Sequence, residues 1–72
     1  MPHFEIKVYP GYTPEQLDAL TKSVVQAAIR DLQVPERVVS VAIETVRPEQ
    51  WEKQVYEPLI QDRPELKKAP EY

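Results

Sequence analysis

Hydrophobic and polar residues alternate along the first part of the chain. Phe4, Ile6 and Val8 fall on one side of an extended segment, with polar residues between them. A period of two is typical of a half-buried strand, and it predicts a strand over residues 3–9. The Pro-Gly pair that follows at residues 10–11 indicates a turn, which ends the strand.

Apolar residues then recur at steps of three and four over residues 14–33, which is the pattern of a helix with one buried face. Thr13 precedes this stretch and can cap the helix, Pro14 suits the first helical position, and Gln16 completes a capping-box pattern. Pro35 favours an end just before it, because the residue before a proline is pushed out of the α region. We therefore predict one long helix over residues 14–33.

Residues 38–46 alternate again, with Val39, Val41 and Ile43 on one side. Strand, helix and strand make a βαβ unit, in which the two strands run parallel and the crossover is right-handed. The fold class that we expect is therefore α/β (α+β), built on a single βαβ unit. Two strands leave both edges of the sheet open, so we expect dimerisation to complete it.

A weaker apolar pattern follows, and it predicts a short C-terminal helix over about residues 49–60. Pro58 lies inside this pattern and should kink or split the helix at Glu57, since proline cannot donate the helical hydrogen bond. The remaining segment, residues 61–72, contains two more prolines. We expect it to be ordered only where its apolar side chains find a surface to pack on.

The chain is small, with 72 residues, a mass of 8.4 kDa, eight prolines, one glycine and no cysteine. This length allows a single domain, residues 1–72, whose own core leaves a thin margin of stability. Disulfides are excluded without cysteine, and a single histidine argues against a structural zinc site. Self-association is the remaining way for such a chain to gain stability, so we expect a homo-oligomer.

The charge balance restricts the partners of the chain. Nine Lys and Arg residues against twelve Asp and Glu residues give a net charge of −3, the wrong sign for a dedicated nucleic-acid binder. No apolar run approaches the ~20 residues of a membrane span, and the N-terminus has no signal-peptide pattern. We therefore expect a cytoplasmic protein that binds neither nucleic acid nor membrane.

Few residues offer catalytic chemistry. The sequence has no phosphate-binding loop, no metal-binding motif, no Ser/His/Asp pattern and no cysteine nucleophile, so we expect neither a metal nor a cofactor. His3 is a candidate base, although a lone histidine beside the start of a strand is more often a residue of the polar face.

The residue that stands out is Pro2. Initiator methionine is commonly removed before proline, which would leave the secondary amine of Pro2 as the N-terminus. Burial among apolar side chains lowers the pKa of such an amine, and an amine that is neutral near pH 7 is a usable general base. If Met1 stays on the chain, the Pro2 nitrogen is an amide and has no such role. A Met-Pro start is common and by itself indicates no function, so a role for Pro2 depends on the pattern of the rest of the sequence.

That wider pattern resembles the tautomerase superfamily. Pro2 leads directly into a strand, a capped amphipathic helix follows, and a valine-rich parallel strand precedes an aromatic residue, Trp51. The founding member, 4-oxalocrotonate tautomerase, is a βαβ unit with an amino-terminal proline as base, so the resemblance implies this fold and an isomerase activity. Two further details are similar to the dimeric PptA branch, the phenylenolpyruvate-type tautomerases: the opening Pro2-His3-x-x-Ile6-Lys7, and Pro48-Glu49-x-Trp51 followed by a longer C-terminal segment.

The sequence departs from 4-oxalocrotonate tautomerase at two positions. That enzyme holds the carboxylates of its substrate with two arginines, and the matching positions here are Tyr12 and Ser40. Neither side chain offers the charged planar fork of arginine, so the two carboxylates of a dicarboxylate substrate lack the arginine partners that would bind them. The PptA branch resembles this sequence in lacking those arginines. The aromatic residue that borders the family's pocket falls on Trp51.

Strand geometry separates these residues within one chain. Parallel strands begin at the same edge of a sheet, so Pro2 and Ser40 should be neighbours. Tyr12 lies beyond the far end of the first strand, about 23 Å from Pro2 at ~3.3 Å per residue. Tyr12 and Trp51 can therefore reach a site at Pro2 only from another subunit.

The resulting hypothesis is keto–enol tautomerisation of the enol of a 2-keto acid, such as phenylenolpyruvate. Pro2 acts as general base and then as general acid, while Ser40 or a backbone N–H stabilises the developing oxyanion. Trp51 and Phe4 form apolar walls around the substrate.

A single substrate carboxylate has two candidate partners, His3 and Arg47, and the sequence does not choose between them. Two other classes of function stay open: a non-catalytic small dimeric binding or structural protein of the same fold, and promiscuous enol chemistry with a substrate of another kind. We prefer a dimer over a hexamer, because the longer C-terminal segment can cover the surface that smaller members of the family use to trimerise.

Overall fold

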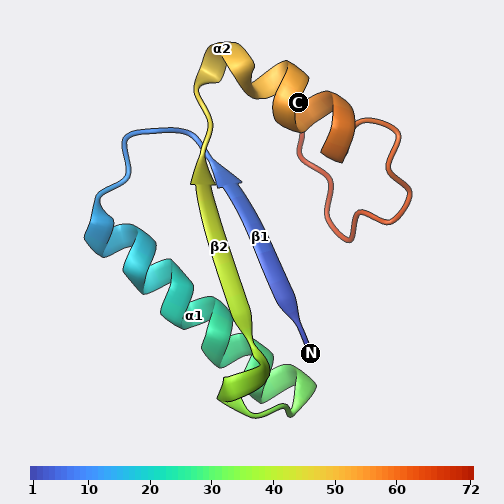
Figure 1. Ribbon diagram of the computed structural model, residues 1–72. Coiled ribbons are helices and arrows are strands. Elements are labelled where there is room, and N and C mark those ends of the chain that lie inside the picture. Colours follow the sequence, from blue (N-terminus) through green and yellow to red (C-terminus); the bar gives the residue numbers. More distant parts are fainter.

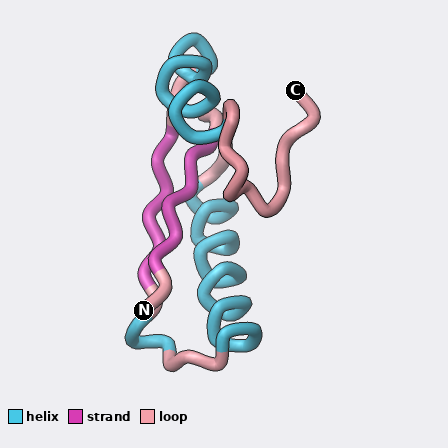
Figure 2. Tube along the Cα trace, turned by 90° about the vertical axis from the view of Figure 1, so that its right-hand side faces the viewer, coloured by secondary structure: helices cyan, strands magenta, loops and turns pink.

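Two parallel strands and one long helix form the main body of the computed structural model, which describes residues 1–72 (Figure 1). β1 spans His3–Val8, α1 spans Pro14–Leu32 and β2 spans Ser40–Thr45. The strands lie side by side, and α1 runs along one face of the pair (Figures 1 and 2). The predicted parallel βαβ unit is therefore confirmed.

Both strands are shorter than the predicted ranges, residues 3–9 and 38–46. β1 ends one residue early. A 3-10 turn, η1 at Glu36–Val38, takes up the start of the second predicted range, because its three-residue hydrogen bonds tighten the chain before the strand begins. β2 therefore starts only at Ser40.

The register of the two strands decides which side chains share a face. His3 lies opposite Ser40, and Lys7 lies opposite Glu44. Successive side chains of a strand point to opposite faces, so these polar residues share one face and the apolar alternates share the other. The apolar face is turned toward α1, whereas no helix covers the polar face (Figure 2). We call this uncovered side the open face.

Local hydrogen bonds define both ends of α1. Thr13 Oγ1 accepts from the Gln16 N–H at 3.1 Å, and Gln16 Oε1 accepts from the Thr13 N–H at 2.8 Å, so the predicted capping box is present. At the other end Gln33 is left-handed, with φ of 56°, and its N–H donates to the Ile29 carbonyl at 3.0 Å. The helix therefore ends at Leu32, one residue early. Neither α1 nor any other helix is long and apolar enough to cross a membrane.

The C-terminal helix runs through its proline. α2 covers Pro48–Trp51, and the chain continues as a π-helix, η2, over Glu52–Ile60. Of the predicted kink or split at Glu57, the split is not observed, since the π-helix continues through Pro58. Proline in an α-helix clashes with the carbonyl four residues earlier, and the wider turns of a π-helix relieve that clash. The last wide turn is closed by the Gln61 N–H, which donates to the Tyr56 carbonyl at 2.7 Å.

The isolated chain has almost no interior. Only Ala28, Val46 and Val55 are buried, while Tyr12 and Leu32 are each more than half exposed. The radius of gyration is 13.7 Å, whereas a compact chain of this length has about 11 Å. The C-terminal helix projects from the end of the strands (Figure 1). A chain with so little buried apolar surface needs a partner to be stable, which agrees with the expectation from composition.

Candidate active site

The sequence-predicted site residues fall mainly into two groups at opposite ends of the sheet. Pro2, His3 and Ser40 lie at the end where both strands begin, which we call the amino edge. Tyr12 and Trp51 lie at the other end and line a hollow, which we call the aromatic pocket. At ~3.3 Å per residue, the length of β1 places the two groups roughly 20 Å apart. One chain therefore does not bring them together.

Backbone hydrogen bonding fixes Pro2 beside Ser40. The Ser40 N–H donates to the Pro2 carbonyl at 3.2 Å, which extends the parallel ladder by one residue toward the N-terminus. Pro2 is half-buried, whereas Met1 is 97% exposed and accessible. The nitrogen that removal of Met1 would free is therefore held at the amino edge of the sheet.

His3 links Ser40 to Glu5 across the open face. Its Nδ1 lies 2.6 Å from Ser40 Oγ, and its Nε2 lies 3.0 Å from Glu5 Oε1. The hydrogen bond from His3, reinforced by its charge, lowers the pKa of the Glu5 carboxyl below its ordinary value. The three side chains make a continuous hydrogen-bonded series beside Pro2, which we call the Glu5–His3–Ser40 run.

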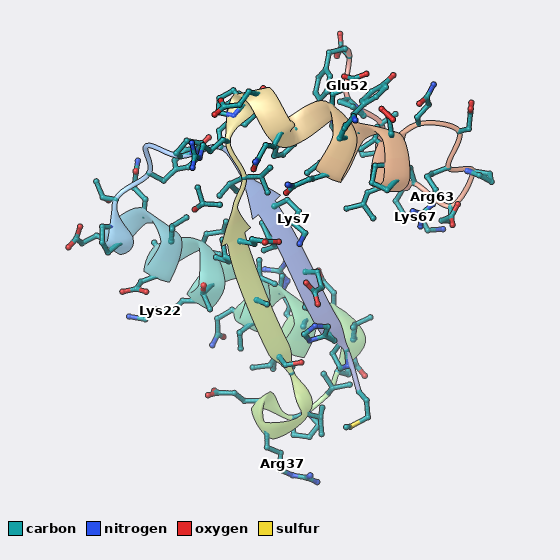
Figure 3. All side chains as sticks on the ribbon, turned by 45° about the horizontal axis from the view of Figure 1, so that its top comes forward. Lys7, Lys22, Arg37, Glu52, Arg63 and Lys67 are labelled. Carbon is teal, nitrogen blue, oxygen red and sulfur yellow. The ribbon has the colours of Figure 1, made fainter.

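Lys7 and Glu44 form an ion pair farther along the same face. The hydrogen bond to Glu44 raises the pKa of Lys7, so the ammonium remains charged throughout the neutral range. In Figure 3, Lys7 lies over the sheet, whereas Arg37 and Lys67 lie toward opposite ends of the molecule. Lys7 is the only cation that lines the aromatic pocket.

The aromatic pocket has a volume of about 410 Å³ and mostly apolar walls. Trp51 packs edge-on against Tyr9, with ring centroids 5.0 Å apart and an interplanar angle of 82°. The Trp51 Nε1–H donates to the Tyr72 hydroxyl at 3.3 Å, so the end of the C-terminal tail forms one side. Aromatic walls of this kind suit a flat apolar group. The lining residues are Lys7, Val8, Tyr9, Tyr12, Trp51 and Tyr72.

Phe4 does not form a wall with Trp51 in the same chain. Its side chain faces α1 and lines a different hollow, together with Val24 and Ala28. The alternation of the strand explains this position, because Phe4 and His3 point to opposite faces. Within one chain, Phe4 therefore lies on the face of the sheet toward α1, opposite the face that carries His3.

The two candidate partners of a substrate carboxylate lie at opposite ends of the sheet. Arg47 directly precedes α2, its side chain is 74% exposed, and its Nη1 lies 3.6 Å from Glu49 Oε1. His3 lies at the amino edge, next to Pro2. Only His3 can face a substrate that is held at Pro2 of the same chain, whereas Arg47 can do so only from a partner.

Sequence reasoning missed Glu5 in the Glu5–His3–Ser40 run, and Lys7, Val8, Tyr9 and Tyr72 in the aromatic pocket. The period of two places Glu5 on the face of His3, but a carboxylate on a polar face is indistinguishable from a solvated one until its partner is known. Tyr72 gives no local signal, because 21 positions separate it from Trp51 and no periodic pattern joins the two.

The known proteins that are similar to this chain are tautomerases. A family model described as "Tautomerase enzyme" matches residues 2–55. Tautomerase PptA of Cronobacter sakazakii is 38% identical over 58 residues, which cover 79% of this chain and 76% of that protein. Tautomerase PptA of Enterobacter sp. (strain 638) is 36% identical over 74 aligned positions, which cover 100% and 97% of the two chains. Among solved structures, TomN, a 4-oxalocrotonate tautomerase homologue of the tomaymycin biosynthetic pathway, is similar with a TM-score of 0.68 and 30% identity, covering 69% of this chain and 77% of that one.

Proposed function

The chain belongs to the tautomerase family, in its PptA branch, and from this premise we propose that it converts the enol form of a 2-keto acid to the keto form with Pro2 as its base. As a tautomerase it is an isomerase, and the family acts on small molecules. The proposed base is the secondary amine that removal of Met1 frees. The observation that supports this role most is the hydrogen bond from the Ser40 N–H to the Pro2 carbonyl, which holds the nitrogen at a fixed place.

Two proton transfers complete the proposed reaction. The neutral Pro2 nitrogen accepts the proton of the enol hydroxyl, and the electron pair of the broken O–H bond stays on the oxygen, which becomes the negatively charged oxygen of an enolate. The resulting Pro2 ammonium then delivers the same proton to the far carbon of the double bond, which gives the ketone and restores the neutral amine. Protons and electrons balance within the substrate and one amine.

Ser40 has the position from which a developing oxyanion can be stabilised. Its backbone is bonded to Pro2, and its side chain lies on the open face with His3. The Ser40 N–H is already occupied by the Pro2 carbonyl, so the hydroxyl is the donor that this residue still offers. A fixed donor aimed at a developing oxyanion contributes roughly 3 kcal/mol to stabilisation of the transition state.

A second copy completes the proposed site. The aromatic pocket lies too far from Pro2 of the same chain to share a substrate with it. The pocket of one chain can lie next to Pro2 of another only if the two sheets run in opposite directions, side by side. Antiparallel pairing of open strand edges gives that arrangement, because the start of one strand then lies beside the end of the other. Tyr9 and Tyr12, 45% and 54% exposed, are available for such a contact. We propose a homodimer with two shared sites.

The composition of the pocket supports an aromatic monocarboxylate as substrate. The aromatic side chains offer a surface for a flat ring, and phenylenolpyruvate carries such a ring. Tyr12 and Ser40 stand where an arginine fork would bind a second carboxylate, so one carboxylate fits better than two. His3 of the same chain or Arg47 of a partner chain receives it.

Ketonisation of phenylenolpyruvate, followed by ultraviolet absorbance, tests the proposal. Pro2→Ala keeps an amine but loses the proline ring, and we expect its kcat/KM to fall well over tenfold at equal dimer content. Pro64→Ala is the matched control, because Pro64 is exposed in the C-terminal tail, and it should retain the wild-type rate. Equal rates for wild type and Pro2→Ala contradict Pro2 as the base, and no turnover by the wild type excludes this substrate.

A further inference from the structure

The Glu5–His3–Ser40 run lies next to the proposed base without being required by the proton transfers themselves. We propose that Glu5 and His3 are positioning residues that decide whether the Ser40 hydroxyl can donate a hydrogen bond to a substrate oxygen at Pro2. This inference rests on the proposed function and deepens it, because it gives a role at the site to a carboxylate, Glu5, and explains how Ser40 becomes a donor.

The register of the strands brings the three side chains together. His3 and Ser40 lie directly opposite each other, and Glu5 follows His3 by two residues on the same face. The ring of His3 therefore bridges a neighbour on β2 and a neighbour on its own strand, at 2.6 Å and 3.0 Å. His3 and Glu5 expose 52% and 62% of their side chains, so solvent and a substrate can both reach them.

The donors and acceptors of the run leave only two arrangements of protons. An ionised Glu5 carboxylate can only accept, so the Nε2 of His3 must carry a proton. When the ring is neutral, its Nδ1 has a lone pair and must accept the Ser40 hydroxyl proton. That proton is the only one that Ser40 has, and in this state Ser40 offers nothing to a substrate oxygen.

Protonation of the ring reverses the hydrogen bond to Ser40. Both ring nitrogens of His3 then donate, Ser40 Oγ accepts from Nδ1, and the hydroxyl proton is free to point at the substrate. The hydrogen bond to His3 and the charge of the ring lower the pKa of the Glu5 carboxyl, so an ionised Glu5 beside a charged ring is a favourable pair. The other charges on the open face, Lys7 and Glu44, already pair with each other. In this state the imidazolium places a positive charge beside Ser40, although position 40 itself has no cationic side chain.

A nucleophilic role for Ser40 fits the geometry less well. A serine bonded to a histidine that is bonded to a carboxylate also occurs in acyl-transfer enzymes. Such enzymes need free backbone N–H groups near the serine, and the Ser40 N–H is occupied by the Pro2 carbonyl. The run is therefore suited to orienting a hydroxyl beside Pro2, with the proline amine as the reacting group.

Phenylenolpyruvate ketonisation by a set of variants tests the inference. We expect Glu5→Gln, which keeps the shape and removes the charge, to lower kcat about tenfold with little change in KM, because the oxyanion forms only in the transition state. Glu5→Asp keeps the charge and should fall between wild type and Glu5→Gln. Asp31→Asn is the matched control: it removes an exposed carboxylate whose pKa is also lowered by a hydrogen-bonded neighbour, Arg30, and it should keep the wild-type kcat.

A double variant separates positioning from a general effect of charge. If Glu5 acts through Ser40, Glu5→Gln should change kcat less than twofold when Ser40→Ala is already present. An undiminished tenfold loss in the Ser40→Ala background overturns the inference, as does a wild-type kcat in Glu5→Gln itself.

Nitrogen NMR of the histidine ring gives a readout that does not depend on activity. The chain has one histidine, so its ring signals need no assignment between residues. We expect the neutral ring of the wild type to carry its proton on Nε2, and Glu5→Gln to weaken that preference. A neutral ring that carries its single proton on Nδ1 in the wild type overturns the run as described. If Pro2→Ala is fully active, the proposed role of Pro2 as base is overturned. If Pro2→Ala is inactive but Glu5→Gln keeps the wild-type kcat, only the positioning role of Glu5 and His3 is overturned.

Discussion

Two inactive variants should restore activity when they share one dimer. The perturbation is a mixture of Pro2→Ala, which replaces the proline amine by a primary amine, and Trp51→Ala, which lacks a wall of the aromatic pocket. Six residues of β1 separate the amino edge from that pocket, a distance of roughly 20 Å that no substrate of this size spans. Each site must therefore take Pro2 from one chain and Trp51 from the other.

The size of the recovery follows from the symmetry of a twofold dimer. Random exchange of subunits in an equal mixture makes about half of the dimers hybrid. Each hybrid has one site with both native residues and one site with neither, so we expect roughly a quarter of the wild-type rate per chain. Each parent alone should stay below about a tenth of that wild-type rate.

The assay is phenylenolpyruvate ketonisation before and after subunit exchange, with dimer content checked by analytical ultracentrifugation. The two parents measured separately and then summed are the control. A mixture no more active than that sum would place the whole site within one chain and refute the shared-site reasoning. A Trp51→Ala protein that is fully active on its own would remove Trp51 from the site.

The other expected outcomes concern stability, measured by thermal or urea unfolding at one fixed protein concentration. Thr13→Ala breaks the capping box and should lower the free energy of unfolding by about 1 kcal/mol, or the Tm by about 4–8 °C. The control is Ser23→Ala, at an exposed position inside α1, which should leave the stability unchanged. If Ser23→Ala lost as much stability as Thr13→Ala, the capping role of Thr13 would be contradicted. The lowered pKa of Glu5 means that its stabilising effect is present above the ordinary glutamate pKa and is lost as the pH falls through the lowered value. The stability difference between wild type and Glu5→Gln should therefore shrink on acidification, and a constant or growing difference would contradict the His3 hydrogen bond. Trp51→Phe keeps the edge contact but loses the hydrogen bond to Tyr72, and it should cost about 1 kcal/mol or less.

Most of the fold could be predicted because its signals are local. The alternation around Phe4 and the capping box at Thr13 each involve residues within a few positions, and both appear in the structure as expected. The π-helix around Pro58 could not be predicted in the same way. The local rule for proline allows a break or an altered helix, and the choice depends on tertiary packing of residues such as the buried Val55 in that segment.

The candidate site was predictable where backbone pairing alone determines it. Parallel strands place Pro2 beside Ser40, and the hydrogen bond between their backbones follows directly. The bond between His3 and Glu5 depends on side-chain rotamers, which periodicity does not encode. The position of Phe4 shows a further limit, since a strand residue can line a pocket or support a helix depending on which face the helix covers.

The chemical state of the Pro2 nitrogen is the most direct test of the account. A sample purified with Met1 retained can be assayed for phenylenolpyruvate ketonisation before and after treatment with methionine aminopeptidase, with intact mass measured at both points. The chain is otherwise identical, and only an amide becomes an amine. We expect kcat/KM to rise more than about a hundredfold as the mass falls by one methionine, because an amide nitrogen cannot accept the enol proton. Equal activity before and after complete removal of Met1 would contradict Pro2 as the base.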